Sequence, residues 1–259
     1  MKKLVTSTFL FLIALAPTLA QTTVDARDII AKINRKEAVS YQNATITGDL
    51  DLTNLANRKE VREGSWKGES REYLSVVEAP ISFKNCVFKG KFLAYRTDAS
   101  EERRVISISN TVYNADFTEA VTVQNCTFED DATFKYSNFG QRALFTDNTF
   151  REIALFKYAK FHNDADFSGS SFRGYADFKY ANFNESSAFQ KVAFDNYADF
   201  KYTKFDERVN FQQARFSRMA DFKYTHLPRG TNFDDARFEG GTDFKYTTLD
   251  GRKFSPSRR

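Results

Sequence analysis

A large apolar residue recurs every eleven residues along most of this chain. The first series holds Phe at all of its positions from Phe134 to Phe244. A second series follows five residues behind, from Phe139 to Leu249, and holds Phe or Leu at every position. Because a fixed period of this kind is the signature of a repeat architecture, the chain is predicted to fold as a stack of similar units.

The residues around each large apolar one follow a simple alternation. The residue two positions before it is small in most repeats, as Ala176 is before Phe178, and the remaining positions are mostly polar or charged. Alternation over three residues followed by a polar step predicts very short strands joined by tight corners. The small and the large residue are expected to face the interior, and the residue between them is expected to face water.

The segments 176–180 (Ala-Asp-Phe-Lys-Tyr) and 181–183 (Ala-Asn-Phe) resemble the pentapeptide-repeat family, whose unit is Ala-(Asp/Asn)-(Leu/Phe)-x-x. The resemblance extends from about Ser82 to Phe254, and the unit recurs in register. It implies an all-β solenoid, a right-handed four-sided parallel β-helix with one pentapeptide on each side. This chain departs from the family unit by one added residue at every second corner.

The size of one coil follows from a longer period. The tripeptide Phe-Lys-Tyr recurs every 22 residues, whereas the half-period positions never repeat the Lys. The copies begin at Phe134, Phe156, Phe178, Phe200, Phe222 and Phe244. One coil is therefore predicted to contain 22 residues on four sides, with neighbouring coils about 4.8 Å apart.

The N-terminus has the order of a secretory signal peptide. Lys2 and Lys3 precede an apolar run, which ends in small residues. We predict that residues 1–20 are this signal, cleaved after Ala20, and that the protein is bacterial and either secreted or periplasmic. The apolar run is too short to span a bilayer comfortably, so no membrane-spanning segment is expected.

The two ends of the stack are expected to differ. Residues 21–40 are predicted to contain a short helix that caps the N-terminal end, because Ala26, Ile29 and Ile33 share one helical face and Thr23 precedes them as a capping residue. Coils are expected over 41–254, no equivalent cap follows Phe254, and residues 255–259 form a polar tail. An uncapped edge invites pairing, and the resemblance implies a homodimer through the C-terminal end.

Two insertions interrupt the upstream coils. The register is kept there only if a charged loop of about seven residues lies near 97–103. A longer interruption near 57–79 carries many charged residues and the only tryptophan, Trp66. Since insertions in repeat proteins form surface loops, the loop around Trp66 is a candidate recognition element.

The most regular surface is formed by the Lys and Tyr of the tripeptide. Stacked Tyr rings, and Lys residues neutralised by the Asp residues that precede each Phe from Asp177 onward, would explain this surface as scaffold alone. The same strip would suit an extended, weakly acidic polysaccharide, with sugar rings on Tyr and carboxylates on Lys, or a protein partner. The candidate binding residues are Lys157, Tyr158, Lys179, Tyr180, Lys201, Tyr202, Lys223 and Tyr224.

Cys86 and Cys126 both occupy small inward positions in Asn-Cys-x-Phe segments. The register places them on opposite walls, about one and a half coils apart, which is beyond the reach of a disulfide. We therefore favour buried free thiols over a bridge, although export would permit a bridge.

Composition and motifs argue against several functions. The formal net charge is +4, and removal of Lys2 and Lys3 leaves +2. Neither nucleic-acid binding nor the acidic DNA mimicry of some cytoplasmic pentapeptide-repeat proteins is therefore expected. The two His residues lack metal-ligand spacing, and the sequence has no nucleophile elbow or Gly-rich phosphate loop. We expect no catalytic residue, cofactor or metal site.

The sequence thus predicts a secreted, non-enzymatic structural or interaction protein. Its rigid β-helical scaffold is expected to engage a protein or an envelope component, and the alternative is a glycan-binding module that uses the Lys/Tyr surface. An enzyme is disfavoured, because only the 57–79 insertion could build a groove with converging acids and bases.

Overall fold

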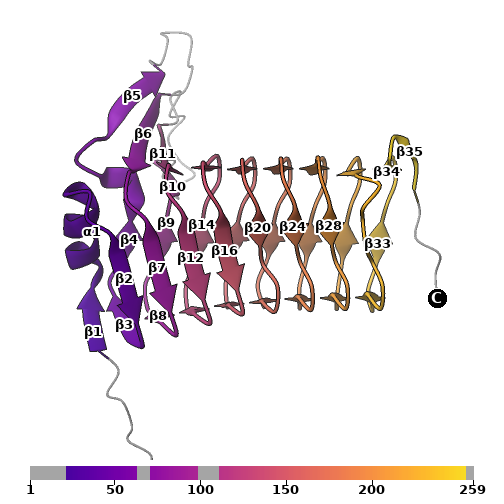
Figure 1. Ribbon diagram of the computed structural model, residues 1–259, viewed down its shortest axis with the longest axis horizontal. Helices are drawn as coiled ribbons and strands as arrows, with labels where there is room; N and C mark the ends of the chain where they lie inside the picture. The colour runs from indigo at the N-terminus through magenta and orange to yellow at the C-terminus, as the bar shows by residue number, and fades with distance from the viewer. Residues whose placement is uncertain (1–21, 63–70, 99–110, 255–259) are drawn as a thin grey trace, which may run out of the picture.

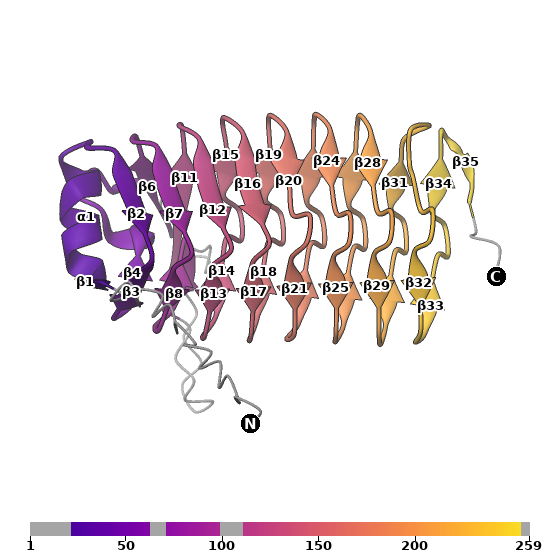
Figure 2. The same cartoon turned by 60° about the horizontal axis from the view of Figure 1, so that its bottom comes forward.

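The chain winds into a rod of stacked four-sided coils. The computed structural model describes residues 22–62, 71–98 and 111–254. Four parallel sheets run along the rod, and successive strands of each sheet come from successive coils (Figures 1 and 2). The predicted all-β, four-sided β-helix is confirmed. The predictions for residues 1–20, for Trp66 and for 255–259, and part of the predicted 97–103 loop, lie outside the described residues.

The sheets are numbered here in the order in which a coil visits them. Sheet 1 contains β4 (Leu50–Asp51), β9 (Phe92–Leu93), β14 (Ala132–Thr133), β18 (Ala154–Leu155), β22 (Ala176–Asp177), β26 (Ala198–Asp199), β30 (Ala220–Asp221) and β33 (Thr242–Asp243). Sheet 2 contains β5 (Lys59–Arg62), β6 (Glu72–Val77), β10 (Tyr95–Thr97), β11 (Val112–Phe117), β15 (Asn138–Phe139), β19 (Lys160–Phe161), β23 (Asn182–Phe183), β27 (Lys204–Phe205), β31 (His226–Leu227), β34 (Thr248–Leu249) and β35 (Arg252–Lys253).

The other two sheets complete the coil. Sheet 3 contains β2 (Val39–Gln42), β7 (Ile81–Lys84), β12 (Val121–Gln124), β16 (Ala143–Thr146), β20 (Ala165–Asp166), β24 (Ser187–Ala188) and β28 (Val209–Asn210). Sheet 4 contains β1 (Thr22–Asp25), β3 (Ala44–Thr47), β8 (Val87–Phe88), β13 (Thr127–Phe128), β17 (Thr149–Phe150), β21 (Ser171–Phe172), β25 (Ala193–Phe194), β29 (Arg215–Phe216) and β32 (Arg237–Phe238). The helical elements are α1 (Ala26–Asn34) and the 3-10 helix η1 (Leu52–Asn54).

Strand pairing fixes the regular coil at 22 residues, as predicted. Ala176 of β22 pairs with Ala154 of β18 on one side and with Ala198 of β26 on the other. A tight turn leads from sheet 1 to sheet 2, and it is closed by the Ala181 N–H, which donates to the Phe178 carbonyl over 2.9 Å. A second tight turn leads from sheet 3 to sheet 4, so the added residue of each half-coil falls at the two remaining corners.

Phenylalanine rings fill the interior in columns that follow the sheets. Phe178 is fully buried, and the rings of Phe156 and Phe200 stack on it with centroids 5.0 and 5.1 Å away. Phe167 and Phe189, from the column of sheet 3, meet it edge-on at 5.3 and 5.4 Å. Each such aromatic pair contributes about 0.5–1.5 kcal/mol beyond the burial of its surface, so the columns hold the coils together.

The predicted helix is present at the N-terminal end of the stack (Figure 2). It buries Ala26, Ile29 and Ile33 against the first coil, as the apolar face predicted. The predicted capping residue is wrong: Asp25 is the N-cap, and its side chain accepts from the Arg27 N–H over 2.9 Å. Thr23 instead belongs to β1, which extends sheet 4 by pairing with β3.

Both insertions lie at the corner between sheets 1 and 2. The first insertion contains the antiparallel pair β5 and β6, which projects beyond the coils (Figure 1). The second returns to the coil through the antiparallel pair β10 and β11. Paired residues of these coils are 42 and 40 positions apart, compared with 22 in the regular part. The second insertion is therefore longer than the predicted loop of about seven residues.

The C-terminal end is partly covered, which the sequence analysis did not predict. After β34 the chain reverses, and β35 pairs with β34 in the antiparallel direction. This reversal places the ring of Phe254 5.8 Å from Phe244 and 6.0 Å from Phe233. Phe233, Phe244 and Phe254 nevertheless remain only partly buried, unlike the interior Phe residues in the middle of the rod.

Replacement of Phe178 by Ala is expected to lower the free energy of unfolding by about 3–5 kcal/mol, because it empties a site enclosed by rings on every side. The same change at Phe238, which is only partly buried near the C-terminal end, should cost distinctly less. Urea unfolding followed by far-UV circular dichroism measures both. Equal losses for the two variants would contradict a core whose packing weakens toward the end.

Candidate functional site

The predicted Lys and Tyr residues come together at a corner of the coil, not on a flat sheet face. Each Lys-Tyr pair forms the tight turn between sheets 1 and 2, so the turns of successive coils align in two columns. Neighbouring Tyr rings are nearly parallel, with centroids 4.6–5.1 Å apart. The Tyr column contains Tyr136, Tyr158, Tyr180, Tyr202, Tyr224 and Tyr246, and the Lys column contains Lys135, Lys157, Lys179, Lys201, Lys223 and Lys245.

Every residue of the Tyr column has a left-handed backbone conformation. The φ angles lie between 57° at Tyr202 and 65° at Tyr136. Such a conformation costs a residue with a β-carbon about 1–2 kcal/mol, and turns of this shape usually place Gly or Asn there. Contacts with two neighbouring rings, at about 0.5–1.5 kcal/mol each, offset this cost. Ring stacking along the column, more than the residue preference of the turn, therefore explains why Tyr occupies these positions.

Ring stacking also decides which part of each Tyr a partner can reach. Tyr180 and Tyr202 are 37% and 40% exposed, yet each has a neighbouring ring on both faces. Only the ring edges and hydroxyl groups are free along the column, and Tyr246, at its end, is the most exposed member at 55%. Between its two ends, the column thus offers no ring face on which a sugar could stack in the predicted way.

Lys201 and Lys223 of the Lys column are neutralised by Asp residues of sheet 1. Lys201 Nζ lies 3.2 Å from an oxygen of Asp199 and 3.4 Å from one of Asp221, and Lys223 Nζ lies 3.2 Å from Asp243. The same Asp residues accept backbone hydrogen bonds from the turn, such as the 2.9 Å bond from the Lys201 N–H to Asp199 Oδ1. The ammonium groups of Lys201 and Lys223 are therefore engaged by their own chain.

The Asp residues of this cluster do not face water, and that expectation was wrong. Asp177, Asp199 and Asp221 are only 2–6% exposed. For Asp199 and Asp221, a tyrosine of the preceding coil explains this burial: the hydroxyl of Tyr175 donates to Asp199 over 3.1 Å, and that of Tyr197 donates to Asp221 over 2.9 Å. Phenol hydroxyls and Lys ammonium groups thus replace water as partners of buried carboxylates.

Burial and charge shift the pKa values in this cluster. Burial and the hydrogen bond to Asp221 raise the pKa of Tyr197 to about 12. Burial by itself would lower the pKa of Lys201, but its hydrogen bonds to Tyr197 and Asp199 raise it overall. Burial also raises the pKa of the Asp177 carboxyl, because its backbone hydrogen bond opposes the effect only in part. Tyr197 and Lys201 consequently remain protonated at neutral pH.

The N-terminal half of the Lys column has no such neutralisation. In the described parts of the chain, no carboxylate oxygen lies within 4.0 Å of the ammonium nitrogen of Lys135, Lys157 or Lys179. Lys135 Nζ instead donates to the hydroxyl of Tyr95 over 3.1 Å. In the coil of Lys157, sheet 1 has Leu155 at the position that Asp177 occupies in the next coil.

Aromatic and cationic groups continue past the end of the Tyr column, at the base of the two insertions. Tyr73 of β6 and Tyr113 of β11 stack with centroids 5.3 Å apart. The guanidinium carbon of Arg96 lies 3.8 Å from the centroid of Tyr113, and that of Arg58 lies about equally far from both rings, at 5.6 and 5.5 Å. Cation–π contacts of this kind hold the insertions rigidly against the corner.

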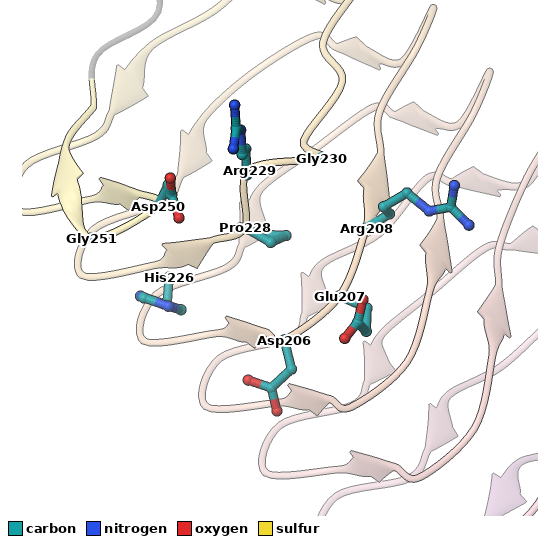
Figure 3. A pocket seen from close by; sticks show the side chains of 9 residues that line it. All are labelled: Asp206, Glu207, Arg208, His226, Pro228, Arg229, Gly230, Asp250 and Gly251. Atoms are coloured by element: carbon teal, nitrogen blue, oxygen red, sulfur yellow. The ribbon is translucent and has the colours of Figure 1, made fainter.

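A hollow of about 330 Å³ lies on a different corner, between sheets 2 and 3 near the C-terminal end (Figure 3). Its charged side chains point in different directions and do not converge on a common point, so the hollow does not form a catalytic centre. Asp206 already pairs with Lys204 Nζ over 2.7 Å. The lining residues are Asp206, Glu207, Arg208, His226, Pro228, Arg229, Gly230, Asp250 and Gly251.

Within residues 22–62, 71–98 and 111–254, no group of three or more His, Cys, Asp or Glu residues is placed to hold a metal ion. His162 and His226 are both exposed, and the Nδ1 of His226 lies 3.0 Å from the Thr248 hydroxyl. Within the same ranges, every helix falls short of the length and apolar character that a membrane crossing requires.

The regular coils are also recognised by comparison with known proteins. A family model described as Pentapeptide repeats (9 copies) matches residues 156–204 and 200–248. These are the coils in which paired residues lie 22 positions apart. The regular coils over residues 156–248 belong to the pentapeptide-repeat family. No curated protein and no solved structure matches it.

The two cysteines of this pentapeptide-repeat chain lie in one column, so their predicted placement on opposite walls is wrong. The length of the second insertion places Cys126 in register with Cys86 in the next coil of sheet 4, where the Cys86 N–H donates to Cys126 Sγ over 3.3 Å. Both are buried free thiols, as favoured above. The hydrogen bond with Cys86 and burial together raise the pKa of the Cys126 thiol.

The Lys and Tyr columns were predicted from the sequence, but two sets of contacts that define them were not. The partners of the Asp residues could have been found, since Tyr175 and Tyr197 are themselves one coil apart in the sequence. The contacts of Arg58 and Arg96 could not, because they join segments separated by insertions of irregular length. Trp66 stays a predicted recognition residue.

Replacement of Asp177 by Asn should raise the free energy of unfolding at pH 7. The pKa of Asp177 is higher in the folded than in the unfolded state, so its contribution to stability is complete below the unfolded pKa and is lost as the pH rises through the folded pKa. Asn removes that loss and keeps the turn hydrogen bond, as Asn210 does in sheet 3. Urea unfolding should show the gain at pH 7 and none at about pH 3, below the ordinary Asp pKa.

The matched change Asp199→Asn should have the opposite sign. It removes the carboxylate that lies 3.2 Å from Lys201 and accepts from Tyr175, so it should lower the free energy of unfolding at pH 7 by about 1–3 kcal/mol. A gain in stability for Asp199→Asn, or a loss for Asp177→Asn, would contradict the assigned pairing.

Alkylation with iodoacetamide should label neither Cys86 nor Cys126 in the native protein, because both thiols are about 1% exposed. Two labels should appear, by intact mass, after unfolding in guanidinium without a reductant. A chain that takes up no label after unfolding until a reductant is added would carry a bridge between the two.

Proposed function

We propose that this pentapeptide-repeat protein is an exported, non-enzymatic structural and interaction protein that presents its Lys/Tyr corner to a protein or an envelope component. The observation that carries the proposal is the Tyr column, in which six left-handed turns present ring edges and hydroxyl groups in one straight row. A rigid row of this kind suits an extended partner, because little conformational entropy is lost when the surface is already ordered.

The architecture supports a scaffold more than an enzyme. Pentapeptide-repeat proteins are structural and interaction scaffolds. In the described residues, the charged groups of the corner are engaged with one another in the C-terminal half and lie in a straight row in the N-terminal half. Neither arrangement makes a concave site in which an acid and a base could act on one substrate atom.

Export and self-association are parts of the same proposal. The order of residues 1–20, with Lys2 and Lys3 before an apolar run and cleavage after Ala20, favours a secreted or periplasmic protein. A homodimer through the C-terminal end is favoured by the incomplete burial of Phe233, Phe244 and Phe254, which β35 covers only in part.

A second candidate function is glycan binding at the same corner. The Lys ammonium groups and Tyr hydroxyl groups favour it, since both can hydrogen-bond to a polysaccharide. The covered ring faces argue against the aromatic stacking by which many neutral sugars could be held. A glycan at this corner would therefore be held through its charges and hydroxyl groups.

The test is co-sedimentation of the chain from Gln21 to Arg259 with envelope material from the cells that produce it. The variant Tyr158→Asn/Tyr180→Asn/Tyr202→Asn should lose most of the binding and remain folded, because Asn tolerates the left-handed turn better than Tyr does. The control Ile153→Asn/Lys160→Asn/Lys191→Asn changes exposed residues away from the Tyr column and should bind normally. Undiminished binding by the Tyr variant would overturn the proposal.

A further inference from the structure

The two halves of the Lys column have different electrostatic surroundings. Lys201 and Lys223 each lie within 4.0 Å of two carboxylates. The described residues offer no ion pair to Lys135, Lys157 and Lys179 in the other half, although the turns have the same shape. For Lys135 and Lys157 the difference arises from the neighbouring strands of sheet 1 and not from the turn.

The Asp column of sheet 1 begins at Asp177, in the coil of Lys179, and does not extend to the coils of Lys157 and Lys135. The position occupied by Asp177, Asp199 and Asp221 in later coils holds Thr133 and Leu155 in the earlier ones, as the strand pairing shows. Asp177 is the nearest member, and its charge reaches Lys157 without forming an ion pair. Lys135 and Lys157 are thus left beside neutral strands, and in the described residues Lys179 forms no ion pair although Asp177 lies in its own coil.

This row is unfavourable for the isolated protein. Like charges directly opposite one another on neighbouring strands repel, and the coil spacing of about 4.8 Å keeps the ammonium groups close. The lysines cannot turn freely away, because all three are partly buried beside the rings, with Lys135 and Lys179 Nζ 4.8 and 5.2 Å from the centroids of Tyr136 and Tyr180. An anionic partner with charges at the same spacing would remove the repulsion.

We propose that Lys135, Lys157 and Lys179 form a docking site for an acidic polysaccharide, specifically a polyuronate that lies along the Lys/Tyr corner with its carboxylates paired to these lysines. The inference deepens the proposed function and rests on it. Each ammonium group is a compact point charge that suits a single carboxylate, and the hydroxyl groups of Tyr136, Tyr158 and Tyr180 lie beside the row to meet the sugar hydroxyl groups. Charge complementarity therefore selects the partner, with no need for a free aromatic face.

Other anionic polymers fit this row less well. Single-stranded nucleic acids bind chiefly by stacking their bases on exposed aromatic faces, and the faces in this column are occupied by neighbouring rings. An extended acidic peptide places same-side carboxylates about 6.7 Å apart, twice the rise per residue of a strand, and brings no hydroxyl groups to meet those of the Tyr column. A polyuronate carries one carboxylate per sugar ring together with ring hydroxyl groups that can hydrogen-bond to the Tyr hydroxyl groups.

The test is binding of the chain from Gln21 to Arg259 to immobilised polygalacturonate at low salt, measured by biolayer interferometry. Lys135→Gln/Lys157→Gln/Lys179→Gln should weaken binding roughly tenfold, as expected for the loss of three exposed ion pairs. The control Lys84→Gln/Lys160→Gln/Lys191→Gln removes the same charge from exposed lysines on other parts of the coil and should bind like the unchanged chain.

A second pair of variants leaves every Lys and Tyr in place. Leu155→Asp extends the Asp column by one coil, so it should place a carboxylate beside Lys157 and weaken binding, whereas Leu155→Asn adds no charge and should not. Binding of the unchanged chain should also fall as salt is raised from low to physiological concentration.

Several results would overturn the proposal. Equal loss in the two triple variants would show that binding follows net charge and not this row, and equal or stronger binding to poly-L-glutamate would assign the row to acidic peptides. Binding to neutral dextran at the same strength would exclude a charge-selected site. If polygalacturonate does not bind while envelope co-sedimentation depends on the Tyr column, the polyuronate is wrong and the scaffold function stands. If polygalacturonate does not bind and envelope co-sedimentation does not depend on the Tyr column, the Lys and Tyr columns serve only to stabilise the fold.

Discussion

Backbone hydrogen bonds between successive coils place each residue directly over the residue 22 positions further along the chain. All of the molecule's columns follow from this register: Phe rings stack in the interior, and Tyr, Lys and Asp side chains stack on their own kind outside. For Phe and Tyr the register is favourable, because rings meet face against face. For Lys and Asp it is unfavourable, since equal charges are superimposed. At the corner, Lys and Asp side chains pair with one another, as Lys201 does with Asp199 and Asp221, and this pairing relieves the repulsion within each column.

The interior of the rod could be predicted almost residue by residue, because a residue's burial there depends only on its position in the period. The corner could be predicted only in part. The columns of Lys157 and Tyr158 follow from the period, but the left-handed turn conformation depends on ring contacts that run against local propensity. The insertions could not be placed either, because the strands at their bases, such as β10 and β11, pair outside the period. Cys86 was placed on the wrong wall because the length of the second insertion was underestimated.

The corner between sheets 1 and 2 carries either a Lys-Tyr turn or an insertion. A coil can extend its chain at a turn without disturbing the register of its strands, because the paired residues on either side stay in place. The first two coils use this freedom to build β5, β6, β10 and β11, and the later ones keep the short turn. Inserted strands and the Tyr column therefore adjoin end to end, and the ring of Tyr95 in β10, which meets Tyr136 edge-on at 5.9 Å, forms the junction between them.

The 22-residue coil makes the outer surface additive. Duplication of one coil in the gene would lengthen the rod by about one strand spacing and would add one phenol and one ammonium group to the row, without altering any neighbour. The number of contacts with a polymeric partner would grow in equal steps, and the apparent affinity would grow by a roughly constant factor per step. A solenoid of this type can thus change its affinity for a polymer through the number of its tandem coils, with no substitution at any contacting residue.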